Sequence, residues 1–253
     1  MILILSSFVA ASPVGGGAQM KALAAIETET VLAPTTLFGR HPGLGPPGGG
    51  AVTAEMFDGV LNGIAEAGVF ASLTAVITGY FASAAQVDRA VRALGSARAA
   101  RPEVRIVVDP IMGDSGKGLY VAPEVARAQA ERLAPLADLL APNAWELQRL
   151  TGCVIADPGS ALAAARECGG SVLVSSVPAG REIGVLWTDG EEAWLARHAA
   201  APGSVHGAGD LLTALFTAAL VEGASGPDAL ETAVSDVAAF VLGAPTRVAM
   251  EAL

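Results

Sequence analysis

The segment SVHGAGDLLTALFTAAL at 204–220 places a carboxylate, Asp210, directly after two glycines and before an apolar run with helical spacing. One interpretation is structural, because an acidic side chain at a helix start accepts unpaired backbone N–H groups and lies at the positive end of the helix dipole. The other is chemical. The glycines leave the backbone amides of Gly207, Ala208 and Gly209 open to an approaching anion. An anion cradle beside a carboxylate indicates phosphoryl transfer, and this segment alone leaves both interpretations open.

A second polar loop follows an apolar strand pattern in VRIVVDPIMGDSGKGLYV at 104–121. Asp109 stands at the expected strand end, and Asp114, Lys117 and Tyr120 follow it. Asp-Pro and Gly-Asp pairs also make ordinary turns, which is the structural alternative. Ligands of open α/β sheets gather outside the carboxyl ends of the strands. Two acids and a lysine on such a loop favour Mg²⁺ and phosphate, although the spacing does not match a P-loop.

A third segment, LLAPNAWELQRLTG at 139–152, repeats this design. A short strand pattern precedes Asn143, and Glu146 falls in the first turn of the helix that follows. An acid in a first turn complements the helix dipole, which explains Glu146 without any ligand. At the carboxyl end of a neighbouring strand, however, the pair would lie beside the Asp109 loop. We therefore expect both acid-bearing loops to face one cleft.

Short β-rich runs alternate with longer helical patterns, which is typical of βαβ units and a mostly parallel sheet. The predicted strands are 2–5, 30–33, 75–78, 105–108, 138–140 and 172–174. The predicted helices are 18–26, 54–67, 84–100, 123–133, 144–150, 159–167, 211–220 and 228–242. Thr53 and Ser83 are expected N-caps, and Gln86 is expected to complete a capping box with Ser83. Glycines 68, 152 and 169 are expected helix stops.

The pattern changes after residue 174, where runs at 183–187 and 193–195 flank a Thr-Asp-Gly turn and predict a hairpin at an antiparallel edge. The glycine- and proline-rich stretch at 39–50 predicts an exposed, mobile loop. Neither an interdomain linker nor a repeat is visible. We predict a single domain over 1–253, with three α/β layers around a mostly parallel central sheet and an antiparallel edge.

Composition limits the function classes. The chain has 253 residues, 52% of them hydrophobic, so it can bury a large core, and its formal net charge of −10 argues against a nucleic-acid partner. Two cysteines and three histidines show neither disulfide nor metal-ligand spacing. The apolar start lacks the basic region of a secretory signal peptide, and no run reaches the ~18 apolar residues of a membrane span. We expect a cytoplasmic protein without membrane contact.

Four stretches in order, DPIMGDSGKGLYVAPE, ADLLAPNAWELQRLTG, VSS and GAGDLLTALF, resemble the pyridoxal kinase branch of the ribokinase-like superfamily. The stretches SSFVAASPVGGGA and ITGY are similar to it too, so the resemblance runs from Ser6 to about Leu220. It implies a ribokinase-like fold and a kinase that uses ATP and Mg²⁺.

For the transfer itself, the resemblance implies that Asp210 is the base and that Gly207, Ala208 and Gly209 form an amide anion hole. The residues implied to hold Mg²⁺ and its waters are Asp109, Asp114, Asn143 and Glu146. The residues implied near the nucleotide are Ser175, Ser176 and Tyr120, the last on a flap, with Lys117 on the same loop. We expect Asp114 and Glu146 to be exposed loop acids whose removal leaves the fold intact.

For the vitamin, the resemblance implies that Ser7 meets the pyridine ring, that Tyr80 forms an aromatic wall and that His41 lies in a loop over the pocket. It also implies a homodimer, with the loops around 39–50 near the mouth of the site. Pro42 and Ala141 depart from the hydroxyl residues that relatives usually carry. The first change removes a possible substrate contact, and the second weakens the expectation of a K⁺ site.

The leading hypothesis is an ATP-dependent kinase that phosphorylates the 5′-hydroxymethyl group of pyridoxal, and of pyridoxine and pyridoxamine. Positioning and charge stabilisation carry most of phosphoryl transfer, and amides, Mg²⁺ and one carboxylate supply both. The alternative within enzymes is a hydroxymethylpyrimidine (phosphate) kinase, which shares the scaffold. The alternative from another class is a sensor that binds vitamin B6 or nucleotide without turnover, which the intact Asp210 disfavours.

Overall fold

The computed structural model describes residues 1–200 and 206–253, and its centre is one ten-stranded sheet. The strand order is β12-β11-β10-β9-β8-β5-β4-β1-β2-β3. The strands of this sheet are β1 (Ile2–Val9), β2 (Thr30–Phe38), β3 (Gly49–Ala51), β4 (Ala75–Thr78), β5 (Arg105–Val108), β8 (Leu139–Leu140), β9 (Ser171–Ala179), β10 (Glu182–Thr188), β11 (Ala193–Ala199) and β12 (Ala249–Ala252). The strands from β9 through β2 in this order pair in parallel, while β10, β11 and β12 extend the sheet antiparallel at one edge and β3 at the other.

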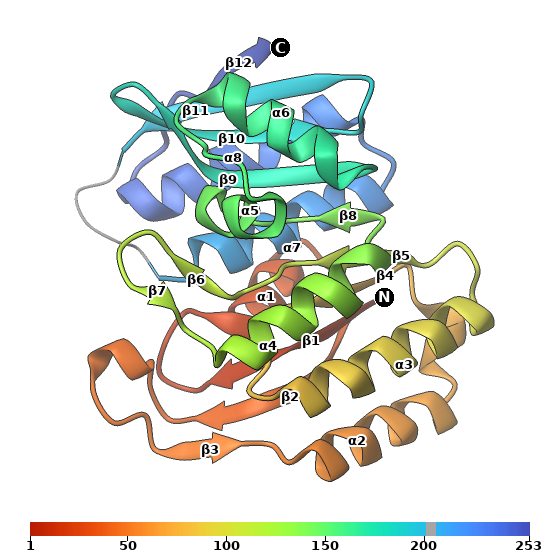
Figure 1. The fold of residues 1–253 in the computed structure, drawn as a ribbon. Coiled ribbons are helices and arrows are strands. Elements are labelled where there is room, and N and C mark those ends of the chain that lie inside the picture. Colours follow the sequence, from red (N-terminus) through yellow and green to blue (C-terminus); the bar gives the residue numbers. More distant parts are fainter. Residues whose placement is uncertain (201–205) are drawn as a thin grey trace.

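Helices cover both faces of this sheet. They are α1 (Gly15–Ala25), α2 (Ala54–Glu66), α3 (Ala84–Ala100), α4 (Pro123–Ala128), α5 (Ala144–Thr151), α6 (Pro158–Cys168), α7 (Ala208–Val221) and α8 (Gly226–Leu242). In Figure 1, α2 to α6 lie in front of the sheet and α1, α7 and α8 behind it. Short helical turns are η1 (Pro42–Leu44), η2 (Val69–Ser72), the π-type η3 (Gln129–Leu133) and η4 (Ala134–Leu136). The predicted three-layer fold with a mostly parallel sheet and an antiparallel edge is confirmed.

The alternation of side chains along β1 divides the core into two layers. Leu3 and Leu5 face the cluster that includes Phe57 of α2 and Leu94 of α3. Ile2 and Ile4 face the opposite cluster, which includes residues of α1, α7 and α8. All four β1 side chains are at most 1% exposed. Because a parallel strand is covered on both faces, it is a continuous apolar run, as the start of this chain is.

Pairing with neighbours extends several elements beyond their predicted bounds. The strand predicted at 2–5 runs to Val9, and those predicted at 30–33 and 172–174 become β2 and β9 of nine residues each. Four short strands had no signal in the sequence, namely β3, β12 and the hairpin of β6 (Gly113–Asp114) and β7 (Gly118–Leu119). In the stretch predicted as an exposed loop, the structure places η1 and the start of β3.

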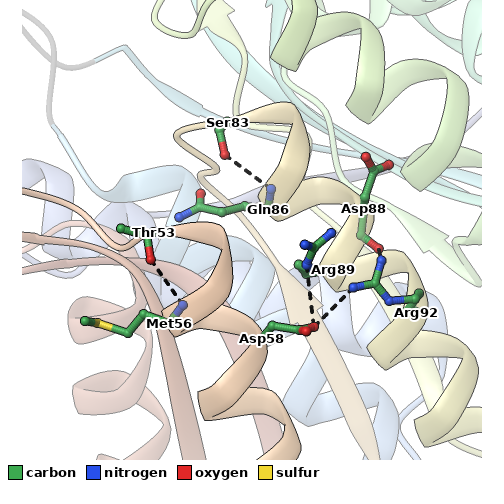
Figure 2. A network of polar contacts seen from close by, with 8 residues as sticks. All are labelled: Thr53, Met56, Asp58, Ser83, Gln86, Asp88, Arg89 and Arg92. Carbon is green, nitrogen blue, oxygen red and sulfur yellow. Dashed lines mark hydrogen bonds and ion pairs between the residues drawn. The ribbon is translucent and has the colours of Figure 1, made fainter.

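The starts of α2 and α3 follow the predicted caps, with one correction (Figure 2). Thr53 accepts a hydrogen bond from the Met56 N–H, and Ser83 accepts one from the Gln86 N–H. The Gln86 side chain does not accept a hydrogen bond from the Ser83 N–H, so the capping box is only half formed. Its Oε1 accepts from the Ala82 N–H at 2.8 Å instead.

Buried Gln86 also donates to the carbonyl oxygens of Thr35 and Val52, 2.9 and 2.6 Å away. The side chain is therefore a brace between α3 and β2 rather than a local cap. On the outer surface, Asp58 of α2 pairs with Arg89 and Arg92 of α3 (Figure 2). Such exposed pairs contribute little to stability.

Among the described helices, none is both long enough and apolar enough to serve as a membrane span.

Candidate active site

A cavity of about 560 Å³ opens where the carboxyl ends of β1, β4, β5 and β8 meet the N-terminus of α7. A volume of this size suits a small-molecule ligand. The predicted site residues that line it are Ser7, His41, Tyr80, Asp109, Asp114, Lys117, Tyr120, Asn143, Glu146, Ser175, Gly207, Gly209 and Asp210. The structure therefore brings both acid-bearing loops into one cleft, as expected from the carboxyl ends of their strands, and the start of α7 lines the same cleft.

Two predicted residues, Ala208 and Ser176, are not among the lining residues. The side chain of Ala208 packs against the core layer behind the sheet. Ser176 is exposed on β9 and has a φ of 58°, in the left-handed region. It forms a bulge with Ser175, because those two residues lie opposite Val185 alone on β10. The bulge leaves Ser175 at the cavity and takes Ser176 away from it.

Asp210 does not cap its own helix. The N-cap of α7 is Gly207, and Asp210 occupies the third helical position. Its Oδ2 accepts a hydrogen bond from the Gly15 N–H at 2.8 Å, while Oδ1 is buried with no hydrogen-bond partner among the described residues. Burial raises the pKa of this carboxyl to about 6, although the Gly15 N–H lowers it. A carboxylate with one free oxygen and a pKa near neutrality is suited to accept a proton.

The N-terminus of α7 is fixed by close backbone packing. Gly207 has a φ of 88°, and a Cβ atom on it would lie 1.9 Å from the carbonyl oxygen of Pro13. Only glycine permits this approach. No side chain of the described residues caps this helix end, so its first N–H groups remain available to an anion. The capping interpretation of Asp210 is therefore wrong, and an open, positively polarised helix terminus lies beside this residue.

Asp109, at the end of β5, is almost fully buried and joins α7. Its Oδ2 accepts a hydrogen bond from the Thr213 hydroxyl at 2.9 Å. Burial raises the pKa of Asp109 well above its usual value, the charges of Glu146 and Asp210 raise it further, and the Thr213 hydrogen bond opposes the shift. Thr213 was not predicted as a site residue, although its position one helical turn after Asp210 places both on one face of α7.

Glu146 is buried rather than an exposed loop acid, which corrects the expectation for this residue. It is 3% exposed, and its carboxylate accepts hydrogen bonds from the N–H groups of Met112, Gly113 and Asn143 at 2.7, 3.2 and 2.9 Å. Asn143 completes a capping box by accepting from the Glu146 N–H. Burial raises the pKa of Glu146 to about 7 against the lowering by these hydrogen bonds.

Asn143 and Glu146 together hold the β6–β7 hairpin, because Asn143 also donates to the Gly113 carbonyl oxygen at 2.9 Å. Within the hairpin, Asp114 accepts from the N–H groups of Gly116 and Lys117 and from the Tyr120 hydroxyl. Burial opposes ionisation of Asp114, but these hydrogen bonds and the Lys117 charge outweigh it, so its pKa is lowered. Asp114 is therefore a fixed negative charge at the cavity.

The acids of the cavity suit a hard divalent cation. Among the described residues, the side chains do not form a closed group of three or more metal-binding groups. The charge of Glu146 nevertheless raises the pKa of Asp109 by repulsion, and a bound cation would relieve this repulsion. Carboxylate and amide oxygens that leave room for water are the donors Mg²⁺ prefers. The residues fit Mg²⁺ held through water.

The rest of the cavity wall combines flat rings with apolar side chains. Tyr80 and the stacked rings of His41 and His206 line it, and the predicted Ser7 lies beside Gly15 at the end of β1. Several further lining residues were not predicted, because apolar and glycine positions carry no chemical signal. These are Val9, Val14, Gly15, Phe38, Gly43, Ile111, Leu173 and Leu212. His206 was not predicted either, because its partner His41 is distant in the sequence.

Comparison with known proteins relates the chain to kinases. A family model described as phosphomethylpyrimidine kinase matches residues 55–248. The pyridoxal kinase PdxY of Rubrobacter xylanophilus is 36% identical over 249 residues, covering 95% of this chain and 86% of that protein. The pyridoxine/pyridoxal/pyridoxamine kinase of Bordetella avium is 34% identical over 239 residues, covering 91% and 80%.

Solved structures share the fold. The pyridoxal kinase from Entamoeba histolytica superposes with a TM-score of 0.91 at 24% identity, over 100% of this chain and 99% of that one. The pyridoxal kinase from Leishmania donovani, in complex with ADP and pyridoxine, gives a TM-score of 0.87 at 23% identity, over 94% and 84%.

Proposed function

The chain belongs to the pyridoxal kinase family of the ribokinase-like superfamily, and from that premise we propose that it transfers the γ-phosphoryl group of ATP to the 5′-hydroxymethyl group of pyridoxal, pyridoxine and pyridoxamine. The Bordetella avium relative is named for all three vitamers, and the Rubrobacter xylanophilus relative is named for pyridoxal. The Leishmania neighbour was solved with ADP and pyridoxine together, so this fold holds a nucleotide and a B6 vitamer at once in that protein.

In the proposed reaction, the substrate hydroxyl gives its proton to Oδ1 of Asp210 while its oxygen attacks the γ-phosphorus. The bond between that phosphorus and the bridging oxygen breaks, and ADP leaves with the bond electrons. The amides of Gly207, Ala208 and Gly209 at the open end of α7 stabilise the charge on the transferring group. Buried Oδ1 without a partner is the observation that carries this proposal.

When bound, Mg²⁺ would neutralise phosphate charge. The residues that would hold it are Asp109, Asp114, Asn143 and Glu146. Lys117, Tyr120 and Ser175 line the side of the cavity proposed for the nucleotide, while Ser7, His41 and Tyr80 line the side proposed for the vitamin. Ser176 lies outside the lining, so its proposed nucleotide contact requires the bulge to rearrange. Ala141 lines the cavity without a hydroxyl group, and assays with and without K⁺ test for a monovalent-cation requirement.

A substrate panel tests the proposal. The purified protein is incubated with MgATP and each of pyridoxal, pyridoxine, pyridoxamine, hydroxymethylpyrimidine and its phosphate, and both ADP and the phosphorylated product are measured. We expect turnover of the B6 vitamers. Turnover of the pyrimidines alone would instead support the activity that the family model's description suggests. Saturable binding of pyridoxal without ADP release would identify a sensor.

We also propose a homodimer in the cytoplasm. The edge next to the cavity loops carries β3, whose three residues are all exposed, and the exposed side chains of Phe8 and Leu37 are direct neighbours in the pairing of β1 with β2. An apolar, unpaired sheet edge is a usual site of association. Both cysteines are free thiols, as a reducing compartment permits. Light scattering after gel filtration measures the mass, and a monomer at micromolar concentration would contradict the dimer.

A further inference from the structure

Two histidines from distant parts of the chain meet at the cavity. His41 lies in the β2–β3 loop (39–48), and His206 directly precedes the N-cap of α7. Their rings stack with centroids 4.3 Å apart and planes inclined by 26°. Both rings line the cavity. The contact thus joins the loop over the cavity to the helix that carries Asp210.

The position of His206 is fixed from the α7 side. Its neighbour Gly207 has its Cα against the Pro13 carbonyl oxygen, so closely that no side chain fits there. Asp210, one turn later, is held by the Gly15 N–H. Because the start of α7 is anchored in this way, the chain directly after His206 is held by contacts that do not involve the β2–β3 loop.

The loop, by contrast, forms hydrogen bonds with another segment of the chain. The carbonyl oxygen of Gly39 accepts from the Ala11 N–H at 2.9 Å, and the His41 N–H donates to the Ser12 hydroxyl at 3.0 Å. These bonds tie the loop to the β1–α1 connection. Toward α7, the described contact is the ring stack with His206. Removing this ring leaves His41 without its partner at the cavity.

The orientation of His41 is fixed within the loop. Its Nδ1 accepts a hydrogen bond from the Gly43 N–H at 3.1 Å, so the neutral ring carries its proton on Nε2. A Cβ atom on Gly43 would lie 2.9 Å from Nδ1. Burial lowers the pKa of His41, with further lowering by the charges of His206 and Lys117, which favours the neutral ring. A neutral ring stacks without charge repulsion.

We infer that His206 is a positioning residue for the alcohol substrate: by stacking on His41 it holds the β2–β3 loop closed against the helix that bears Asp210. This inference rests on the proposed function for its kinetic part only. His206 acts through His41 and through the loop, and it leaves the nucleotide side of the cavity unchanged.

The test uses His206→Ala, His206→Phe, His41→Ala and the double variant His41→Ala/His206→Ala. A stacked ring pair contributes roughly 0.5–1.5 kcal/mol, so His206→Ala should raise KM for pyridoxal about 2- to 10-fold while KM for ATP and kcat stay within about 2-fold. His206→Phe retains a flat ring and should restore the parent KM. If the two rings act as one unit, the double variant should resemble the single ones.

Amide hydrogen exchange of the loop peptides gives a second readout that needs no catalysis. Exchange at 39–48 should become faster in His206→Ala and return toward the parent in His206→Phe. Unchanged exchange in His206→Ala, or additive effects of the two alanine substitutions on KM, would overturn the inference. Should the parent fail to phosphorylate pyridoxal, the exchange experiment still decides the role of His206, and only the proposed function falls.

Discussion

Asp210→Asn should stabilise the fold and lower the activity. In the folded chain, burial raises the pKa of Asp210 from 3.8 to about 6, so keeping the carboxylate charged at pH 7 costs folding free energy. At about 1.36 kcal/mol per pKa unit the shift corresponds to an upper limit of roughly 3 kcal/mol. Asp210 as a whole residue is only half-buried, which reduces our expectation to about 1–2 kcal/mol. Asparagine carries no charge and its Oδ1 can still accept from Gly15. The variant should therefore be more stable than the parent at pH 7.5.

The sign of the pH dependence follows from the raised pKa. Between pH 3.8 and about 6, the folded state holds a proton on Asp210 that the unfolded state has released. The parent thus loses stability through this group as the pH rises across that window. The difference between variant and parent should be near zero below pH 4 and complete above pH 7. Denaturant unfolding at pH 4, 5.5 and 7.5 measures it.

The same variant should lose catalysis, because Asn cannot accept the substrate proton. A positioned base contributes about 10²- to 10⁴-fold, so kcat should fall by that factor while substrate KM values change little. In the parent, kcat/KM should decline as the pH falls below about 6, where Asp210 takes up a proton. A folded Asp210→Asn protein with near-parent kcat would refute the base.

Asp228→Asn is the matched control, because Asp228 occupies the same third position in α8 that Asp210 occupies in α7. Asp228 is exposed and only accepts from the Ser225 hydroxyl. Its replacement should lower stability by about 0.3–1 kcal/mol through the helix dipole and leave kcat unchanged. A stability gain of equal size in both variants would refute the reasoning from burial.

Three further outcomes are expected. Asp114→Asn keeps an oxygen for the turn amides but loses the charge, so the Mg²⁺ concentration for half-maximal rate should rise several-fold; an unchanged requirement would exclude a metal role. Tyr80→Ala should raise KM for pyridoxal by removing a stacking surface of about 1 kcal/mol, and an equal rise for ATP would make Tyr80 a packing residue. Gly207→Ala should destabilise the fold by more than about 2 kcal/mol, since its Cβ would meet the Pro13 carbonyl, whereas Gly209→Ala has open space and should not, as paired melting curves would reveal.

Three acids, two in the candidate site and one outside it, illustrate how far the local sequence pattern predicts a role. Asp210, Glu146 and Asp228 all stand at the third position of a helix, and each fits dipole complementation. Tertiary contacts separate them: Glu146 closes a capping box and holds the β6–β7 hairpin, Asp210 turns to Gly15, and Asp228 stays in solvent. Only the contact between distant segments distinguishes a candidate base from a cap, and the local pattern does not contain it.

The fold was more predictable than the site because its elements carry strong periodicity. The predicted bounds of β4, β5 and α3 agree with the structure residue for residue. By contrast, β3 consists of Gly-Gly-Ala and β12 lies at the end of the chain, and both exist through pairing with a neighbour. Short strands without apolar alternation cannot be recognised until that neighbour is known.

Two contacts that hold the start of α7 join segments far apart in the sequence. The hydrogen bond from Gly15 to Asp210 joins residues 195 positions apart, and the bond from Thr213 to Asp109 joins residues 104 apart. During synthesis the N-terminal strands and helices leave the ribosome long before α7 does. Until α7 arrives, the layer behind the sheet that it completes stays uncovered, with Ile77 and Val107 exposed on that face. We therefore expect a chain that ends before α7 to be inactive and prone to aggregation. Products of premature termination at about residue 207 should be degraded rather than yield partly active enzyme.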